Sequence, residues 1–265
     1  LVDADGRVRA RAQTSTAGPG GAEGLFERLA ELVAGVRAAA DAEVVVCGVG
    51  SGGPMTAGGE AVSPINIPVW RSFPLRSRLA EIVGLPVAVD NDAKALALAE
   101  GWVGAATGYR EYLAMVVSTG VGGGIVLDGR LLDGAQGNAG HIGHVVVEPD
   151  GRPCGCGGRG CLEAEASGTA IAAITGRPPA QADEAVVHRV GTLVGRAVAS
   201  VANLLDLRLA VVAGSVALGF GERFFAAAQD EIERRARLEF AVGTRIRPAA
   251  LGADGPLVGA GAVGW

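Results

Sequence analysis

Three cysteines lie within eight residues of this 265-residue chain, at Cys154, Cys156 and Cys161. Thiols so close in sequence cannot all pair with one another, so a metal site is a better interpretation than a disulfide framework. Two histidines, His141 and His144, come shortly before them. Three thiolates and one imidazole form a closed tetrahedral set that suits a structural zinc ion. On spacing alone, either histidine could be the fourth ligand.

Glycine is the second constraint, with 43 of 265 residues against a usual share of about 7%. Aliphatic segments interrupt it throughout, which favours loops shaped by their backbone over disorder. The net charge of −5 offers no basic surface for nucleic acid. The sequence contains no apolar run of about 18 residues, which a membrane span would need, and no secretory signal is visible at its start. We therefore expect a cytoplasmic protein that binds neither nucleic acid nor membrane through this chain.

The pattern of strands and helices predicts an α/β protein of two lobes. We expect a smaller lobe over residues 1–108 and a larger one over 109–265, with the last residues returning to the small lobe. The first lobe should hold helices at 24–40, 76–83 and 92–103 and strands at 43–49 and 86–89. The second should hold strands at 112–117, 124–127, 209–213 and 245–249, helices at about 162–175, 181–206 and 219–238, and the zinc loop at 137–163.

Two glycine turns follow predicted strands of the larger lobe. In the first, Ser118 and Thr119 lead into Gly120 and Gly122. Such a turn exposes backbone N–H groups on which a phosphate can sit, although a tight hairpin would read the same way. It is not a Walker loop, because the Gly-Lys-Ser/Thr ending is absent. The second turn, at 214–215, could support an adenine ring or be an ordinary connection from a strand to a helix. Taken alone, its sequence favours the ordinary connection.

Carboxylates end the predicted strand before residue 92, in the order Asp90, Asn91, Asp92. Either aspartate could cap the following helix. The functional alternative is a general base that takes a proton from a substrate hydroxyl as it attacks a phosphoryl group. Asn91 could then hold another substrate hydroxyl.

Taken together, these segments resemble the ROK family, named for repressors, open reading frames and kinases. The resemblance spans the chain and is most specific over residues 137–169, which carry a Cys-x-Cys-Gly-x-x-Gly-Cys-x-Glu pattern. It implies the two-lobed, ribonuclease-H-like fold of the actin and sugar-kinase superfamily, with mixed sheets flanked by helices. It also implies a glucokinase-like homodimer that uses ATP, Mg²⁺ and structural Zn²⁺ to phosphorylate glucose or an amino sugar at the 6-hydroxyl.

The resemblance also assigns roles to single residues. Asp92 matches the catalytic base. The sugar contacts it implies are Asn66, Asn91, His141, His144 and Glu163. The zinc ligands it implies are His144, Cys154, Cys156 and Cys161. The ATP contacts it implies are Thr119, Gly120 and Gly122 in the phosphate motif, and Gly214 and Ser215 in the adenosine motif.

Two departures from the family pattern bear on function. The Asp-x-Gly-Gly-Thr phosphate segment is missing, and we expect it to precede Leu1 in the natural protein. The usual Glu-x-Gly-His reads His141-Ile142-Gly143-His144. A neutral imidazole offers one donor and one acceptor, so the sugar contact should weaken or prefer other hydroxyls. The alternatives are a sugar-binding ROK regulator with a preceding DNA-binding domain, or a pseudokinase. The hexose and the choice of ATP or polyphosphate stay open.

Overall fold

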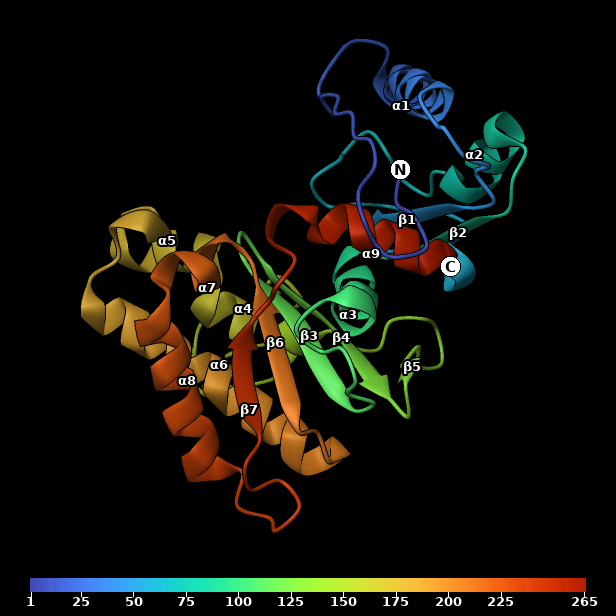
Figure 1. Cartoon of the computed structure of the whole chain (residues 1–265). Helices are drawn as coiled ribbons and strands as arrows, with labels where there is room; N and C mark the ends of the chain where they lie inside the picture. The colour runs from blue at the N-terminus through green and yellow to red at the C-terminus, as the bar shows by residue number, and fades with distance from the viewer.

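The computed structural model describes all residues, 1–265, and the chain forms two sheets flanked by helices (Figure 1). The smaller sheet pairs β1 (Cys47–Ser51) in parallel with β2 (Val87–Asn91). The larger sheet has the strand order β5-β4-β3-β6-β7. Its strands are β3 (Tyr112–Val117), β4 (Val121–Leu127), β5 (Arg130–Leu131), β6 (Leu209–Ala213) and β7 (Arg245–Pro248). This sheet is mixed, because β3, β6 and β7 run parallel while β4 is antiparallel to β3 and β5.

The two faces of the larger sheet are covered by different helices. Leu113 and Met115 of β3 face the main core, which includes residues of α6 (Glu184–Leu205) and α8 (Glu222–Arg235). Tyr112 and Ala114 point the other way, toward α3 (Asp92–Val103). This alternation is the period of two that a strand imposes on its side chains. We call the larger sheet and the helices packed on it the larger part. Its three short helices are α4 (Leu162–Ala166), α5 (Gly168–Thr175) and α7 (Ser215–Phe220).

Helix α6 meets the length and composition of a membrane-crossing helix. However, 61% of its most apolar window is buried inside the protein. Valines and alanines of this helix, among them Val194, Ala197 and Val198, belong to the main core. Its apolar character is therefore accounted for by packing against α8 and the sheet.

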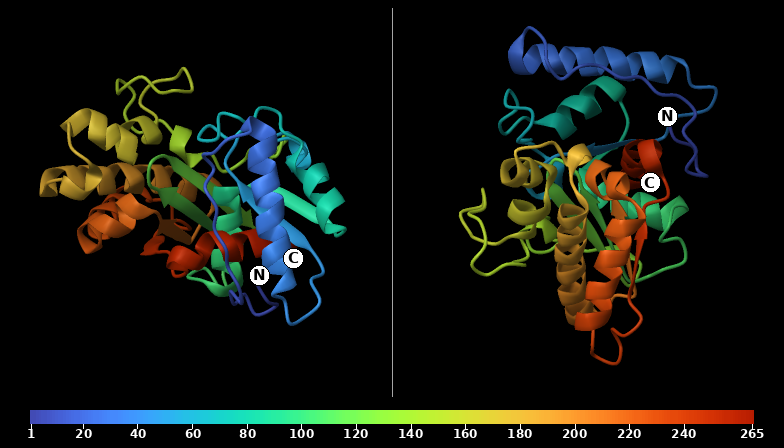
Figure 2. Two further views of the ribbon diagram at one scale, coloured as in Figure 1. Left: turned by 90° about the horizontal axis from the view of Figure 1, so that it is seen from above. Right: turned by 90° about the vertical axis from the view of Figure 1, so that its left-hand side faces the viewer.

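The smaller sheet has its own core, separate from the main one. Helices α1 (Gly21–Ala38) and α2 (Leu75–Val83) contribute to it, and Figure 2 shows α1 as the outermost element on that side. Trp70 and Phe73 stack within it, with ring centroids 4.7 Å apart. The last helix, α9 (Gly255–Gly264), packs across β1. A Cβ on Gly48 would lie 1.8 Å from Ala260 O, so only glycine permits this approach.

Helix α3 lies between α9 and the larger sheet (Figure 1). On one side a Cβ at Gly124 of β4 would lie 2.8 Å from the Cβ of Ala97. On the other side a Cβ at Gly259 would lie 2.9 Å from the backbone of Ala95. Alanines on the helix and glycines on its neighbours thus bring the backbones together. This close packing fixes where the first turn of α3 stands relative to both sheets.

Several predicted elements are confirmed and others need correction. The bounds predicted for the helix at 92–103 and the strands at 112–117 and 209–213 are those observed. The strand predicted at 43–49 begins only at Cys47, where its pairing with Val87 starts, and Val45 is exposed. The strand predicted at 124–127 begins earlier, at Val121. Gly122 to Gly124 pair with β3, and the missing side chains of Gly122 and Gly124 leave room for α3.

Two predicted helices are divided, and one helix was missed. The helix predicted at 219–238 breaks at Gly221, whose φ of 63° is outside the helical region. The helix predicted at 162–175 breaks at Ser167, whose side chain caps α5 by accepting a hydrogen bond from Ala170 N. Helix α9 was not predicted, because its glycines, alanines and valines give no polar and apolar faces to recognise.

Candidate active site and metal centre

The carboxyl ends of β1 and β2 lie side by side, because the parallel register pairs Ser51 with Asn91. Asn91 is the N-cap of α3: its Oδ1 accepts hydrogen bonds from Ala93 N at 2.9 Å and Lys94 N at 3.4 Å. The cap therefore falls on neither of the two aspartates considered from the sequence. Asp92 begins the helix with an exposed side chain. Its Oδ1 accepts a hydrogen bond from Ala93 N at 2.8 Å, and its Oδ2 can face a ligand at this edge, a common place for ligands in α/β sheets.

Two amide side chains border the glycine turn that follows β1. A Cβ on Gly52 would lie 3.5 Å from Asn66 Oδ1, and one on Gly53 would lie 3.7 Å from Asn91 Nδ2. Asn66 comes from the irregular connection between β1 and α2, and it is exposed. The structure thus gathers Asn66 and Asn91, the residue before Asp92, around one turn, although the two asparagines are more than twenty residues apart in sequence.

The first predicted phosphate turn is short and rests on α5. Ser118 N donates to Gly120 O at 2.9 Å, which closes the turn between β3 and β4. Gly168 N donates to Ser118 O at 2.7 Å, and Thr169 Oγ1 donates to Thr119 O at 2.9 Å. The turn is therefore held against the start of α5, whose first N–H groups it occupies with its carbonyl oxygens.

The second glycine turn meets the first. Ser215 Oγ lies 3.0 Å from Ser118 Oγ, although the residues are 97 positions apart. Gly214 has a φ of 101°, and a Cβ there would lie 2.3 Å from Val117 O. Because β3 and β6 are parallel neighbours, their carboxyl ends bring both predicted nucleotide segments together.

Gly122 lies in β4 rather than in the turn, paired with Val116. A Cβ there would lie 3.0 Å from the Cβ of Ala93, so the glycine makes room for the first turn of α3. The strand that leaves the phosphate turn therefore contacts the residue next to Asp92. A contact of Gly122 with a nucleotide stays a prediction.

Glu163 connects the cysteine segment to the phosphate turn. Its Oε2 accepts a hydrogen bond from Val121 N at 2.9 Å. A Cβ on Gly120 would lie 2.8 Å from the same oxygen. Glu163 is half-buried and stands in the first turn of α4, two residues after Cys161. The element that begins at the cysteine cluster thus reaches the proposed phosphate turn.

The predicted metal ligands form one cluster. The ligand atoms of His144, Cys154, Cys156 and Cys161 all lie within 4.8 Å of one another. Cys154 Sγ is 3.7 Å from His144 Nδ1, and Cys156 Sγ is 3.7 Å from Cys161 Sγ. Tetrahedral zinc, with bonds of about 2.3 Å to sulfur and about 2.0–2.1 Å to nitrogen, sets its ligands about 3.5–3.8 Å apart. The cluster could therefore hold a metal ion.

The two histidines left open by spacing are separated by the structure. His144, in the short helix η2 (Ile142–His144), points Nδ1 into the cluster. His141 is exposed, with its ring centroid 6.1 Å from that of His144. His141 is therefore placed beside the metal cluster and outside the ligand set.

The thiols of the cluster have different environments. Burial raises the pKa of Cys161 to about 12. A backbone hydrogen bond from Gly158 lowers the pKa of Cys156. A bound divalent cation deprotonates the thiols that coordinate it. The donor set and its spacing are both consistent with a metal.

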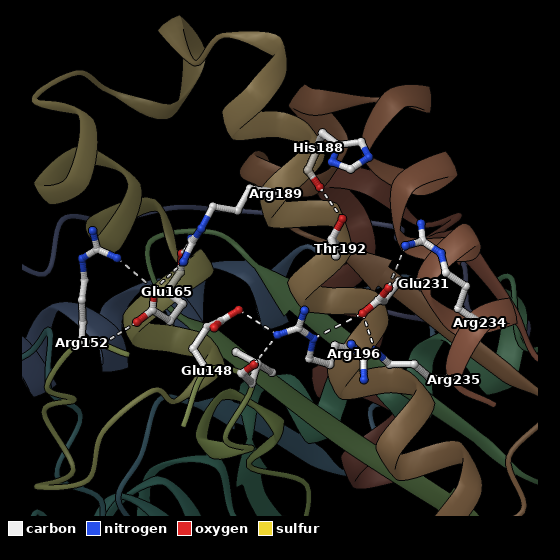
Figure 3. A network of polar contacts seen from close by, with 11 residues as sticks. Glu148, Arg152, Glu165, His188, Arg189, Thr192, Arg196, Glu231, Arg234 and Arg235 are labelled. Atoms are coloured by element: carbon white, nitrogen blue, oxygen red, sulfur yellow. Dashed lines mark hydrogen bonds and ion pairs between the residues drawn. The ribbon is translucent and has the colours of Figure 1, made fainter. Parts of the chain in front are cut away.

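A buried carboxylate fastens the metal loop, residues 145–161, to α4 and α6. Glu165 is 1% exposed. It accepts hydrogen bonds from Arg152 N at 2.5 Å and pairs with the guanidinium groups of Arg152 at 3.0 Å and Arg189 at 2.7 Å (Figure 3). Burial by itself raises the pKa of Glu165, but these hydrogen bonds outweigh burial and hold it below its ordinary value. Arg152 stands just before Cys154, so the network positions the start of the ligand segment.

A second network holds the beginning of the same loop (Figure 3). Arg196 of α6 donates to Val147 O at 2.6 Å and to Glu148 Oε1 at 2.7 Å. Its Nε lies 3.3 Å from the buried carboxylate of Glu231 in α8, which also accepts from Arg235. The metal loop is therefore anchored on the two long helices of the larger part.

Several residues that hold the site in place are absent from the set of residues predicted from the sequence. Glu165, Arg189 and Arg196 act through contacts between distant segments, and no local pattern announces them. Lys94, whose buried ammonium contacts two aspartates, had one available signal. It is the only lysine in the chain, and it stands two residues after Asp92.

Comparison with known proteins agrees with this geometry. The ROK family profile matches residues 1–263. A glucokinase of Thermotoga maritima is 42% identical over 173 residues, which are 64% of this chain and 54% of that protein. The chain thus spans about half the length of that relative. An N-acetylmannosamine kinase of Escherichia fergusonii is 36% identical over 237 residues, covering 83% of this chain and 80% of that protein.

A solved structure shares the fold. The ROK family glucokinase from Streptomyces griseus, in complex with glucose and AMPPNP, superposes with a TM-score of 0.80 and 30% identity. The match covers 98% of this chain and 92% of that one. The two-lobed fold expected from the sequence is confirmed by this neighbour.

Proposed function

Because this chain belongs to the ROK family, we propose that it is a sugar kinase that transfers a phosphoryl group from ATP to the 6-hydroxyl of a hexose. One observation carries the proposal. Ala93, next to Asp92, packs on Gly122, two residues after Gly120 of the phosphate turn. An exposed carboxylate and a turn suited to phosphate therefore belong to adjacent elements, as phosphoryl transfer requires.

In this proposal the site has two sides. The sugar side consists of Asn66, Asn91, Asp92, His141, His144 and Glu163. The nucleotide side consists of Ser118, Thr119, Gly120, Gly214 and Ser215. Gly122 was assigned to the nucleotide from the sequence, and we propose that it acts by bringing β4 close to α3. Relatives named glucokinase and N-acetylmannosamine kinase support a sugar as substrate, and a glucokinase neighbour with AMPPNP supports ATP as donor.

Asp92 is proposed to accept the proton of the 6-hydroxyl as the hydroxyl oxygen attacks the γ-phosphorus, while the bond from that phosphorus to the β,γ-bridging oxygen breaks and ADP leaves. The amides of Asn66 and Asn91 orient the sugar, and the Asn91 cap holds Asp92 in place. The backbone N–H groups of the phosphate turn bind phosphate oxygens, with support from the start of α5. Mg²⁺ supplies charge neutralisation at the β- and γ-phosphates when ATP is bound.

The metal of the cluster is proposed to be zinc in a structural role. All four ligand positions come from the protein, which leaves no open position for a reacting water. His144 belongs both to this cluster and to the proposed sugar side. The ion would therefore order the segment that contacts the sugar. We further propose that the protein is cytoplasmic and that it forms a homodimer. Light scattering of the purified protein would test the homodimer.

The experiment is an ADP-release assay on the protein expressed from the gene's own start codon. Glucose, N-acetylmannosamine and N-acetylglucosamine are compared, with 6-deoxyglucose as the matched control that lacks the accepting hydroxyl. We expect turnover with at least one hexose and none with the 6-deoxy sugar. Sugar binding by calorimetry without ADP release from any hexose would instead favour a pseudokinase or a sugar-responsive regulator.

His141 gives the panel a second use. An imidazole replaces the carboxylate found at this position in the family pattern, and it offers fewer acceptors. We expect the preferred hexose to differ from the others mainly in KM. Restoring the carboxylate with His141→Glu should lower KM for glucose.

A further inference from the structure

The buried ammonium of Lys94 joins the turn that carries Asp92 to a loop of the larger part. Its side chain is only 3% exposed, and lysine is rarely buried unless it is paired. Its Nζ lies 3.1 Å from Asp90 Oδ1, 2.7 Å from Asp133 Oδ1 and 3.2 Å from Gly137 O. These three oxygens match the three N–H donors of an ammonium. The charge is therefore fully paired.

The partners of Lys94 come from different parts of the fold. Asp90 is the next-to-last residue of β2 in the smaller sheet, and its Oδ1 also accepts from Asn91 N at 2.7 Å. Asp133 and Gly137 belong to the β5–η2 loop, residues 132–141. Lys94 itself stands in the first turn of α3, where a Cβ on Gly124 would lie 2.8 Å from its Cα. One side chain thus contacts the end of β2 and the β5–η2 loop from between them.

The β5–η2 loop has little else to hold its outer part. Ala139 N donates to Asp133 O at 2.9 Å, and Leu132 N donates to Ile125 O at 2.8 Å, so these bonds stay within the loop or return to β4. The side chain of Asp133 is 69% exposed. Lys94, a buried side chain from outside the loop, therefore fastens the outer part of the loop to the rest of the protein.

We propose that Lys94 is a positioning residue that holds the β5–η2 loop against the turn carrying Asp92. The inference rests on the proposed function, since the loop runs directly into His141 and η2, which supply proposed sugar contacts. Lys94 sets the distance between these contacts and the base without touching the sugar. A lysine is suited to this task because one compact charge can satisfy two carboxylates and a carbonyl at once.

Hydrogen exchange of the unliganded protein tests the anchoring without any need for turnover. Asp133→Asn removes the negative charge of the exposed partner and keeps an oxygen that can still accept a hydrogen bond, so the fold should survive. We expect the amides of Gly137 and Ala139, which donate hydrogen bonds within the loop, to exchange about tenfold faster, because the ion pair with Lys94 no longer restrains local opening. Lys94→Met should have a larger effect. Asp128→Asn is the matched control, since Asp128 is an exposed aspartate paired with Arg110.

Kinetics then tests the positioning role. Asp133→Asn should raise KM for the hexose about tenfold and leave KM for ATP within about twofold. A loss of general stability would not separate the two substrates in this way. Unchanged exchange in both Asp133→Asn and Lys94→Met would overturn the proposal, as would an equal acceleration in Asp128→Asn. If no hexose is turned over, the proposed function fails, while the exchange result still decides whether Lys94 anchors the loop.

Discussion

The sugar side and the nucleotide side of the proposed site are built by different means. On the sugar side, carboxylate, amide and imidazole groups come from the end of β2, the connection after β1 and the metal cluster. On the nucleotide side, backbone turns at the ends of β3 and β6 meet through two serine hydroxyls 3.0 Å apart. The sugar side therefore depends on side chains and their supports, whereas the nucleotide side depends on how closely the backbone can approach.

The supports of the two sides also differ. The nucleotide side rests on sheet and helix backbone, through bonds such as Gly168 N to Ser118 O. The sugar side relies on ionic contacts that lie behind it, with Glu165 and Arg196 beneath the metal loop and Lys94 beneath the β5–η2 loop. Substitutions should therefore separate the two sides.

The largest effect is expected at the base. Asp92→Asn should lower kcat about 10²–10⁴-fold, because the amide cannot accept the proton of the 6-hydroxyl. The fold should persist, since an amide oxygen can still accept the hydrogen bond that Asp92 Oδ1 receives from Ala93 N. Steady-state kinetics measures kcat, and calorimetry should find both ligand affinities within about threefold of wild type. Full turnover by the variant would remove Asp92 from the role of base.

A smaller effect is expected beneath the metal loop. Glu165→Gln should lower the free energy of unfolding by about 2 kcal/mol, because it breaks a buried ion pair while its arginines stay partly solvated. Chemical denaturation measures the change. Glu148→Gln is the matched control, since that carboxylate is 40% exposed and should contribute less than about 1 kcal/mol.

The contribution of Glu165 should depend on pH. Its folded-state pKa is lowered, so its ionised form stabilises the fold at pH values above the ordinary pKa of 4.5. That stability is lost as the pH falls through the lowered pKa and the carboxylate takes up a proton. The difference between wild type and Glu165→Gln should accordingly be constant near neutral pH and shrink in acid. A difference that grew in acid would contradict the ionic role.

The smallest of the three effects is expected on the nucleotide side. Gly214→Ala places a Cβ 2.3 Å from Val117 O at a φ of 101°, so the connection from β6 to α7 must shift. We expect nucleotide affinity to fall about tenfold with the sugar affinity nearly unchanged. Gly219→Ala in α7 is the matched control, since no atom lies within 4 Å of its added Cβ. Calorimetry with a nonhydrolysable ATP analogue measures both variants, and equal affinities for the two would contradict the close-approach argument.

The sequence could predict the elements whose signals are local. Helix α3 and strands β3 and β6 have clear apolar patterns and end signals, and their predicted bounds are those observed. The four predicted metal ligands gather as the cysteine spacing indicates. From the spacing, however, His141 and His144 were equivalent, and only the position of η2 in the structure separates them. Helix α9 has no periodic pattern, so its packing across β1 could not be inferred from its residues.

The remainder of the site depends on contacts between distant segments. The contact of Ser118 with Ser215 requires the parallel pairing of β3 and β6. The roles of Glu165 and Lys94 require loops to fold over buried charges, which neither periodicity nor motif spacing describes. Gly122 shows a different difficulty, in which a local pattern has two explanations. A glycine suits a phosphate turn, but it also suits a strand that a helix approaches closely.

Metal removal tests the difference between the two sides most directly. The protein is stripped with a chelator, and calorimetry then measures the affinities for the preferred hexose and for a nonhydrolysable ATP analogue. We expect hexose affinity to fall at least about tenfold, nucleotide affinity to stay unchanged, and added Zn²⁺ to restore the hexose affinity. Equal loss of both affinities, or full retention of hexose binding without the metal, would contradict this expectation.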